Sequence, residues 1–142
     1  MKISEIMTNR IVTVDKDEPV IAAARLLKRH NVGALPVTDS EMRLRGIITD
    51  RDIVLRCVAA EGDVRTTRVS EVMSRGIITT GPSDMVESAV KAMSQDQVRR
   101  LPVVEDGHLI GMVALCDMAR SRSCEMEAAE ALSEISANIR RK

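Results

Sequence analysis

Two acidic residues in this sequence close the same local pattern. Asp52 ends the segment Gly46-Ile-Ile-Thr-Asp-Arg-Asp, and Asp117 ends the segment Gly111-Met-Val-Ala-Leu-Cys-Asp. A hydroxyl three residues before a carboxylate, as in Thr49-x-x-Asp52, is also the pattern of a helix-capping box. Ala114 removes that hydroxyl from the second segment, yet Asp117 is present there. The pattern therefore leaves two roles open for these carboxylates, capping and ligand binding, and the two roles can coexist.

The other residue types provide no second set of groups suited to catalysis or metal binding. Cys57, Cys116 and Cys124 have no C-x-x-C spacing, so we expect buried, reduced thiols. His30 and His108 are far apart, and neither has another imidazole or thiol at metal-ligand spacing. No Ser/His/Asp set, Cys/His set or G-x-x-x-x-G-K loop can be assembled. We expect a protein that is not an enzyme, binds no metal and requires no cofactor.

The amino-acid composition argues against two classes of partner, nucleic acids and membranes. The 142 residues are 44% hydrophobic, and 21 basic residues balance 21 acidic ones. Phe, Trp and Tyr are all absent, so nucleic acid would find neither a basic field nor a stacking platform. The N-terminus has no apolar targeting region, and the longest apolar run, Leu109 to Cys116, is too short to span a bilayer. We expect a cytoplasmic protein with no nucleic-acid or membrane partner.

The chain contains one unit of sequence twice. A shift of 66 residues places ISEIMTNRIVT on VSEVMSRGIIT and HNVGALPV on DQVRRLPV, and a shift of 65 places LRGIITDRDI on LIGMVALCDM. The repeat predicts a first copy at 1–60, a connector at 61–68, a second copy at 69–121 and a helical tail at 122–142.

Each copy predicts the order β-α-β-β-α after a short helical turn. Extended segments are expected at 11–14 and 77–80, with strands at 34–38 and 44–49 in one copy and 101–104 and 109–113 in the other. Between them, apolar residues at helical spacing predict two amphipathic helices, with stripes Val20, Ala23, Ala24, Leu27 and Val86, Ala89, Val90, Met93. Final helices start at Asp50 and Leu115. A small sheet with helices on one face stays half covered, so we expect an α+β (α/β-type) fold whose two copies pack sheet to sheet about a pseudo-twofold axis.

With these residues in duplicate, the sequence resembles a tandem cystathionine-β-synthase (CBS) domain pair, or Bateman module. The resemblance is carried by HNVGALPV, DQVRRLPV and the G-h-h-T/S-x-x-D pattern that closes each copy, and it covers about 115 of the 142 residues. It is similar to small stand-alone bacterial CBS-pair proteins. The resemblance implies a regulatory module that binds AMP, ADP, ATP, or sometimes NAD or S-adenosylmethionine, between the copies.

The resemblance also implies which residues bind the ligand. In the family, the Asp of the pattern accepts both ribose hydroxyls, adenine lies between aliphatic side chains, and residues before the Leu-Pro-Val strand meet phosphates. One site then takes Thr49, Asp52, Met73, Gly76, Ile78, Val98, Arg99 and Arg100. The other takes Asp117, Met112, Met7, Arg10, Val12, Val32, Gly33 and Ala34.

The two implied sites are not equivalent. The second lacks a hydroxyl at Ala114 and has no positive charge at Gly33-Ala34, where the other copy has Arg99-Arg100. We therefore expect the site of Asp52 to be the better one, for a nucleoside or a ligand with one phosphate. The two arginines could instead form a solvated face before the strand.

The tail predicts a helix from Arg122 to Arg140. Ala128, Leu132, Ile135 and Ile139 form its apolar stripe. Such a helix could pack on its own module, or it could bind a partner or a second copy, because the family commonly forms homodimers. A ligand-free interaction or scaffold protein with the same fold is the alternative to a sensor.

Overall fold

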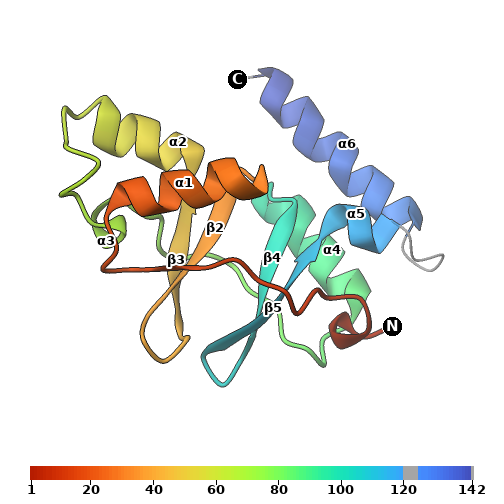
Figure 1. Ribbon diagram of the computed structural model, residues 1–142. Coiled ribbons are helices and arrows are strands. Elements are labelled where there is room, and N and C mark those ends of the chain that lie inside the picture. Colours follow the sequence, from red (N-terminus) through yellow and green to blue (C-terminus); the bar gives the residue numbers. More distant parts are fainter. Residues whose placement is uncertain (120–124, 142) are drawn as a thin grey trace. The chain divides into compact units, whose positions relative to one another are not determined.

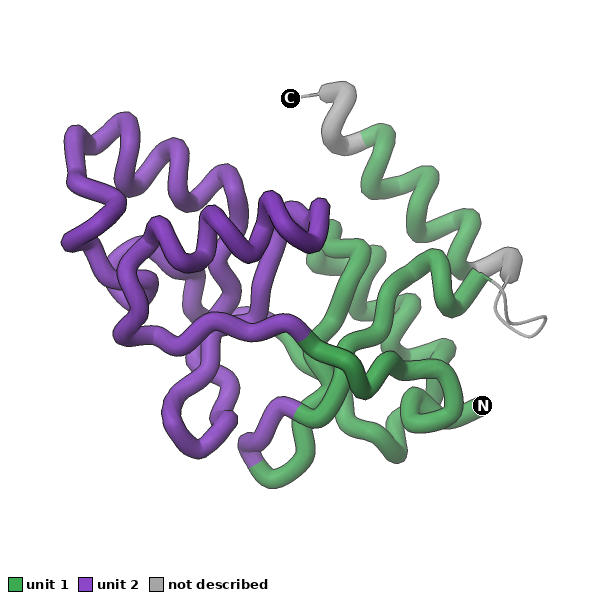
Figure 2. The backbone as a smooth tube through the Cα atoms, viewed as in Figure 1, with its two compact units in different colours: residues 1–11, 78–106, 110–142 green, residues 12–77, 107–109 purple. Residues whose placement is uncertain are grey.

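The computed structural model describes residues 1–119 and 125–141, which divide into two units (Figures 1 and 2). Unit 1 contains Met1–Ile11, Ile78–Asp106 and Ile110–Lys142, and unit 2 contains Val12–Ile77 and Gly107–Leu109. Helices and small sheets occur in both, which confirms the mixed α+β class expected from the sequence.

Unit 2 is built on a three-stranded sheet in the order β1-β2-β3. Strands β1 and β2 are parallel and β2 and β3 antiparallel, with Pro36 opposite Ile47 and a register shift after Val37. Its elements are β1 (Val14–Asp15), α1 (Val20–His30), β2 (Ala34–Thr38), β3 (Leu44–Thr49), α2 (Asp50–Ile53), the π-helix η2 (Val54–Val58) and α3 (Val69–Val72).

Helix α1 forms where the apolar stripe predicts it. Val20, Ala23 and Leu27 are buried in the core of unit 2, and Ala24 packs against that core. Pro19 stands at the N-cap, where it disturbs no hydrogen bond of the helix, and Asn31 ends the helix in the left-handed conformation.

Unit 1 repeats this plan with a smaller sheet. Its elements are the 3-10 helix η1 (Ile3–Glu5), α4 (Val86–Asp96), β4 (Arg100–Glu105), β5 (His108–Ala114), α5 (Leu115–Ala119) and α6 (Glu125–Arg141). The strand expected at 77–80 is reduced to one parallel bridge between Thr80 and Val103, beside the hairpin of β4 and β5. The α4 stripe is buried at all four predicted positions.

The tail helix α6 packs within unit 1, against α4 and α5. Ala128, Ala131 and Ile135 are buried in the core of that unit. The stripe predicted for this helix was wrong at Leu132, which is 44% exposed, because Ala131 takes the inward position. The side chain of Ile139 lies outside the described residues.

The opening segment of each sequence copy belongs to the unit that contains most of the other copy. Ile3, from the start of the first copy, is fully buried in the core that contains Val86 and Val103 of the second copy. Val69, at the equivalent place in the second copy, is buried in the core that contains Val20 and Val37 of the first. Each core is therefore completed by the short helical turn of the other copy.

Candidate functional site

The Asp52 carboxylate closes the start of helix α2. Its Oδ2 accepts the backbone N–H of Thr49 at 3.0 Å, and the Thr49 hydroxyl accepts the backbone N–H of Asp52 at 3.0 Å. Both halves of the capping box are thus present, and the residue is only 8% exposed. The positive end of the helix dipole favours the charged carboxylate at this position. The capping role considered from the sequence is confirmed for this residue.

Two further residues meet the same carboxylate. The Ser74 hydroxyl donates to both Asp52 oxygens, at 3.2 and 3.3 Å. Arg56 places its Nε 4.0 Å from Asp52 Oδ1 and donates from its NH1 group to the carbonyls of Val72 and Met73, at 3.3 and 3.1 Å. The carboxylate therefore joins η2, the end of α3 and the end of β3 in one polar cluster.

A glycine lets Ser74 come this close. Ser74 pairs with Ile47 of β3 through two backbone hydrogen bonds, of 2.8 and 3.0 Å. A Cβ at the neighbouring Gly46 would lie 2.5 Å from the Ser74 carbonyl oxygen and 3.0 Å from the Met73 sulfur. The glycine of the G-h-h-T/S-x-x-D pattern is thus required for the close approach of the Met73-Ser74 segment to β3.

The second carboxylate has a looser version of the same arrangement. Asp117 Oδ2 accepts the backbone N–H of Ala114 at 3.3 Å, and this position has no hydroxyl to complete the box. A Cβ at Gly111 would lie 2.8 Å from the Met7 sulfur and 2.9 Å from the carbonyl oxygen of Thr8, which bridges Met112. The two acidic positions are equivalent in the backbone and unequal in their side-chain partners.

The predicted site residues divide between the two units. In unit 2, Asp52 bonds Thr49, and Met73 packs beside Gly46; in unit 1, Met7 packs beside Gly111. Both predicted sites combine residues of both units. Unit 2 contains Thr49, Asp52, Met73, Gly76, Val12, Val32, Gly33 and Ala34. Unit 1 contains Ile78, Val98, Arg99, Arg100, Asp117, Met112, Met7 and Arg10.

Sequence reasoning missed Ser74 and Arg56. Ser74 stands opposite Thr8 in the repeat, so a hydroxyl after methionine in both copies was the available signal. Arg56 lies four residues after Asp52, a spacing at which opposite charges on a helix interact. Neither signal shows which distant segment the side chain reaches.

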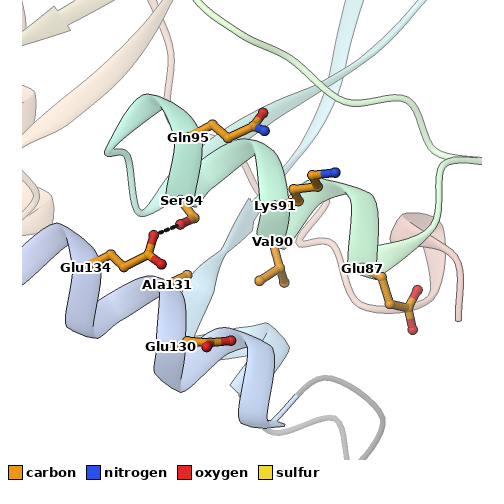
Figure 3. Close-up of a pocket in the computed structure, with 8 residues that line it drawn as sticks. All are labelled: Glu87, Val90, Lys91, Ser94, Gln95, Glu130, Ala131 and Glu134. Atoms are coloured by element: carbon orange, nitrogen blue, oxygen red, sulfur yellow. Dashed lines mark hydrogen bonds between the residues drawn. The ribbon is translucent and has the colours of Figure 1, made fainter.

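A groove between α4 and α6 in unit 1 contains none of the predicted site residues (Figure 3). Its volume is about 430 Å³, its floor is formed by Val90 and Ala131, and Ser94 donates a hydrogen bond to Glu134 across it. The remaining lining residues are Glu87, Lys91, Gln95 and Glu130.

The expectations for the thiols are met only in part. Cys57 is buried, whereas Cys116 on α5 is exposed, so its predicted burial was wrong; Cys124 lies outside the described residues. Within 1–119 and 125–141, no cluster of three His, Cys, Asp or Glu side chains is placed to hold a metal ion. None of the helices seen in that part of the chain has the length and apolar character needed to cross a membrane.

Comparisons with known proteins agree on one family. A model of the CBS domain matches residues 3–58 and 69–123. The chain is 42% identical over 134 residues to the CBS domain-containing protein YhcV of Bacillus subtilis, covering 94% of each. It is 34% identical over 116 residues to hypoxic response protein 1 of Mycobacterium tuberculosis, covering 82% of this chain and 81% of that protein.

Solved structures show the same fold. A crystal structure of Hypoxic Response Protein I with two coordinated zinc ions has a TM-score of 0.78 at 33% identity, covering 85% of this chain and 98% of that one. The CBS domain pair of protein MJ0100, in complex with 5-methylthioadenosine and S-adenosyl-L-methionine, has a TM-score of 0.73 at 27% identity, covering 88% and 98%.

Proposed function

Because this chain belongs to the CBS domain family and carries the domain twice, we propose that it is a non-catalytic regulatory module that binds an adenosine-containing ligand. The ligand class is AMP, ADP or ATP, with NAD and S-adenosylmethionine as further members. A similar CBS pair has been crystallised with 5-methylthioadenosine and S-adenosyl-L-methionine, which supports the class. Binding would favour one arrangement of the module over another, and a partner protein would respond to that shift.

The observation that carries this proposal is the fixed Asp52 carboxylate. It is oriented by the Thr49 box and little exposed, so its charge is pre-organised. A carboxylate has about four acceptor positions, and vicinal ribose hydroxyls offer two donors at matching spacing. The Ser74 hydroxyl already donates to both oxygens, which makes it the group that a ribose hydroxyl would replace or share.

We propose two ligand sites of unequal strength. The stronger contains Thr49, Asp52, Met73, Gly76, Ile78, Val98, Arg99 and Arg100. The weaker contains Asp117, Met112, Met7, Arg10, Val12, Val32, Gly33 and Ala34. Arg99 and Arg100 are exposed at the start of β4, as a phosphate contact requires.

Thermal-shift and calorimetric measurements on ligand-stripped protein test whether the chain binds an adenosine-containing ligand. Adenosine, AMP, ADP, ATP, NAD and S-adenosylmethionine should be compared with guanosine nucleotides. A ligand at ~100 times its Kd stabilises the fold by ~2.7 kcal/mol, which raises the Tm by about 5–12 °C for a chain of this length. Failure of every adenosine-containing compound to bind contradicts the proposal.

Asp52→Asn separates ligand binding from capping, because an amide oxygen can still accept the Thr49 N–H. We expect the variant to fold and to lose at least about tenfold in affinity for adenosine, while Asp117→Asn has the smaller effect. Asp106→Asn, at an exposed turn with φ of 53° that Asn tolerates, is the matched control.

One observation favours a second function, that of a ligand-free interaction or scaffold protein. The cap, Ser74 and Arg56 already occupy the Asp52 carboxylate, so the acid has a complete structural role without a ligand. Under this function Asp52→Asn changes stability alone and no adenosine compound binds. In both cases we expect a cytoplasmic homodimer, which analytical ultracentrifugation of the full chain would test for its oligomeric state.

A further inference from the structure

A second cavity, in unit 2, is lined by positive charge. Its volume is about 420 Å³, and the residues around it are Lys16, Arg45, Ser70, Met73 and Arg75. Three of the five are cations and one carries a hydroxyl, and none of the described residues that line the cavity is acidic. The volume lies within the range of about 300–1,000 Å³ that small-molecule sites occupy.

Backbone hydrogen bonds hold the segments that carry these side chains. The Lys16 N–H donates to the Thr38 carbonyl at 2.9 Å, and the Lys16 carbonyl accepts the N–H of Ser70 at 3.0 Å. Arg45 belongs to β3, and Arg75 follows Ser74, which is bridged to the same strand. Three segments far apart in sequence, around Lys16, Arg45 and Ser70–Arg75, thus bring polar groups to one cavity.

Neighbouring carboxylates engage only part of the N–H donors that the three cations carry. Arg45 meets Asp39 through Nε at 3.0 Å and NH2 at 2.9 Å, which leaves part of its five N–H donors available. Lys16 makes one long ion pair with Asp17, at 3.3 Å, and both side chains are exposed. An exposed pair of this kind contributes little and exchanges readily. Within the described part of the chain, no hydrogen bond or ion pair engages the Arg75 guanidinium.

We infer that this cavity binds a diphosphate group, as free pyrophosphate or as part of a nucleoside diphosphate. Guanidinium and ammonium groups form short, charge-assisted hydrogen bonds to phosphate oxygens, and the Ser70 hydroxyl adds a neutral donor. Three cations lining one cavity match the charge of a diphosphate better than that of a single carboxylate. This site goes beyond the adenosine site proposed above, although Met73 contributes to both.

Calorimetric titration of the full chain with pyrophosphate, ADP, AMP and adenosine tests the inference. We expect Arg75→Gln to weaken pyrophosphate binding roughly tenfold and Lys16→Gln to weaken it severalfold, with adenosine binding unchanged. Arg65→Gln removes an exposed arginine of the same unit that does not line the cavity, and it should bind pyrophosphate like the parent protein. Since all three side chains are exposed, the variants should fold, which the Tm checks.

The outcomes separate this site from the adenosine site. Pyrophosphate binding that depends on Arg75 supports the inference even if adenosine does not bind. ADP binding that depends on Arg75, without pyrophosphate binding, supports it with a nucleotide as the source of the diphosphate. Loss of affinity in Arg65→Gln equal to that in Arg75→Gln overturns it, and so does failure of both pyrophosphate and ADP to bind.

Discussion

At the scale of single residues, the two acidic positions differ by one hydroxyl. Thr49 accepts the Asp52 N–H and completes the cap, while Ala114 has no hydroxyl; among residues 1–119 and 125–141, Asp117 accepts one hydrogen bond, of 3.3 Å. A side-chain cap contributes about 0.5–2 kcal/mol to stability. The inequality expected from the sequence thus has a measurable counterpart in the stability of the two helix starts.

Removing the hydroxyl from the first copy and adding one to the second tests this difference in helix-start stability. We expect Thr49→Ala to lower the free energy of unfolding by about 1 kcal/mol and Ala114→Thr to raise it by a similar amount. Urea denaturation measures both. If Ala114→Thr leaves the unfolding free energy unchanged, the second helix start does not adopt the geometry of the first.

Gly46 makes a second prediction at this scale. Gly46→Ala places a Cβ 2.5 Å from a backbone oxygen that is fixed by the bridge to β3, so we expect a loss of about 1–3 kcal/mol from overpacking. Gly33→Ala is the control, because its Cβ would meet nothing nearer than 3.7 Å. Equal stability of the two variants in urea would show that the Ser74 segment moves away without cost.

At the scale of elements, the turn between β2 and β3 is organised by one carboxylate. Asp39 Oδ1 accepts the N–H groups of Glu41 and Arg43, at 2.9 and 3.0 Å, and Oδ2 accepts from Arg45. These donors, the Arg43 N–H foremost, hold the pKa of Asp39 below its ordinary value, and burial opposes them. The turn is therefore more stable with the carboxylate charged.

This lowered pKa predicts an acid dependence. A carboxylate with a lower pKa in the folded state adds stability above its unfolded pKa, and loses that contribution as the pH falls through the folded value. The Tm difference between the parent protein and Asp39→Asn should be constant above pH ~5 and shrink below pH ~4. Thermal melts from pH 6 to 3 measure it, with Asp106→Asn controlling for the loss of one negative charge. A difference that grows on acidification would contradict the assignment.

Periodicity and duplication predicted most of the elements. The stripes at 20–27 and 86–93 gave α1 and α4, and the β-rich runs gave β2 to β5, because these signals are local. The buried face of α6 was predicted less well. Either Ala131 or Leu132 could point inward, and only packing against the neighbouring helices determines that Ala131 does. Ser74 reaches Asp52 across 22 positions of sequence, and no local pattern encodes such a contact.

At the scale of the whole molecule, each core depends on the opening turn of the other copy. Ile3 and Val69 are equivalent in the repeat and both fully buried, yet Ile3 belongs to unit 1 and Val69 to unit 2. The similar patterns of the two copies could not reveal this exchange, because a repeated pattern does not show which core each turn joins.

Amide hydrogen exchange of two alanine variants tests whether each opening turn belongs to the core of the other copy. Ile3→Ala should cost about 2–5 kcal/mol and reduce amide protection in α4 and β4, although the mutated residue lies in the first copy. Val69→Ala, its matched partner, should reduce protection in α1 and β2 instead. Loss of protection that stays within the mutated copy would contradict the assignment of residues 1–11 to unit 1.

The exchange of opening segments also has a consequence during synthesis. Domains emerging from the ribosome fold as units, the earliest complete one first. Nearly all of unit 2 lies in Val12–Ile77, whereas residues 1–11 are assigned to a core whose other strands and helices begin at Ile78. Residues 1–11 precede unit 2 in the sequence, yet they pack in a core whose other members follow Ile77. They must therefore wait for their native place until well after unit 2 has been synthesised and can fold.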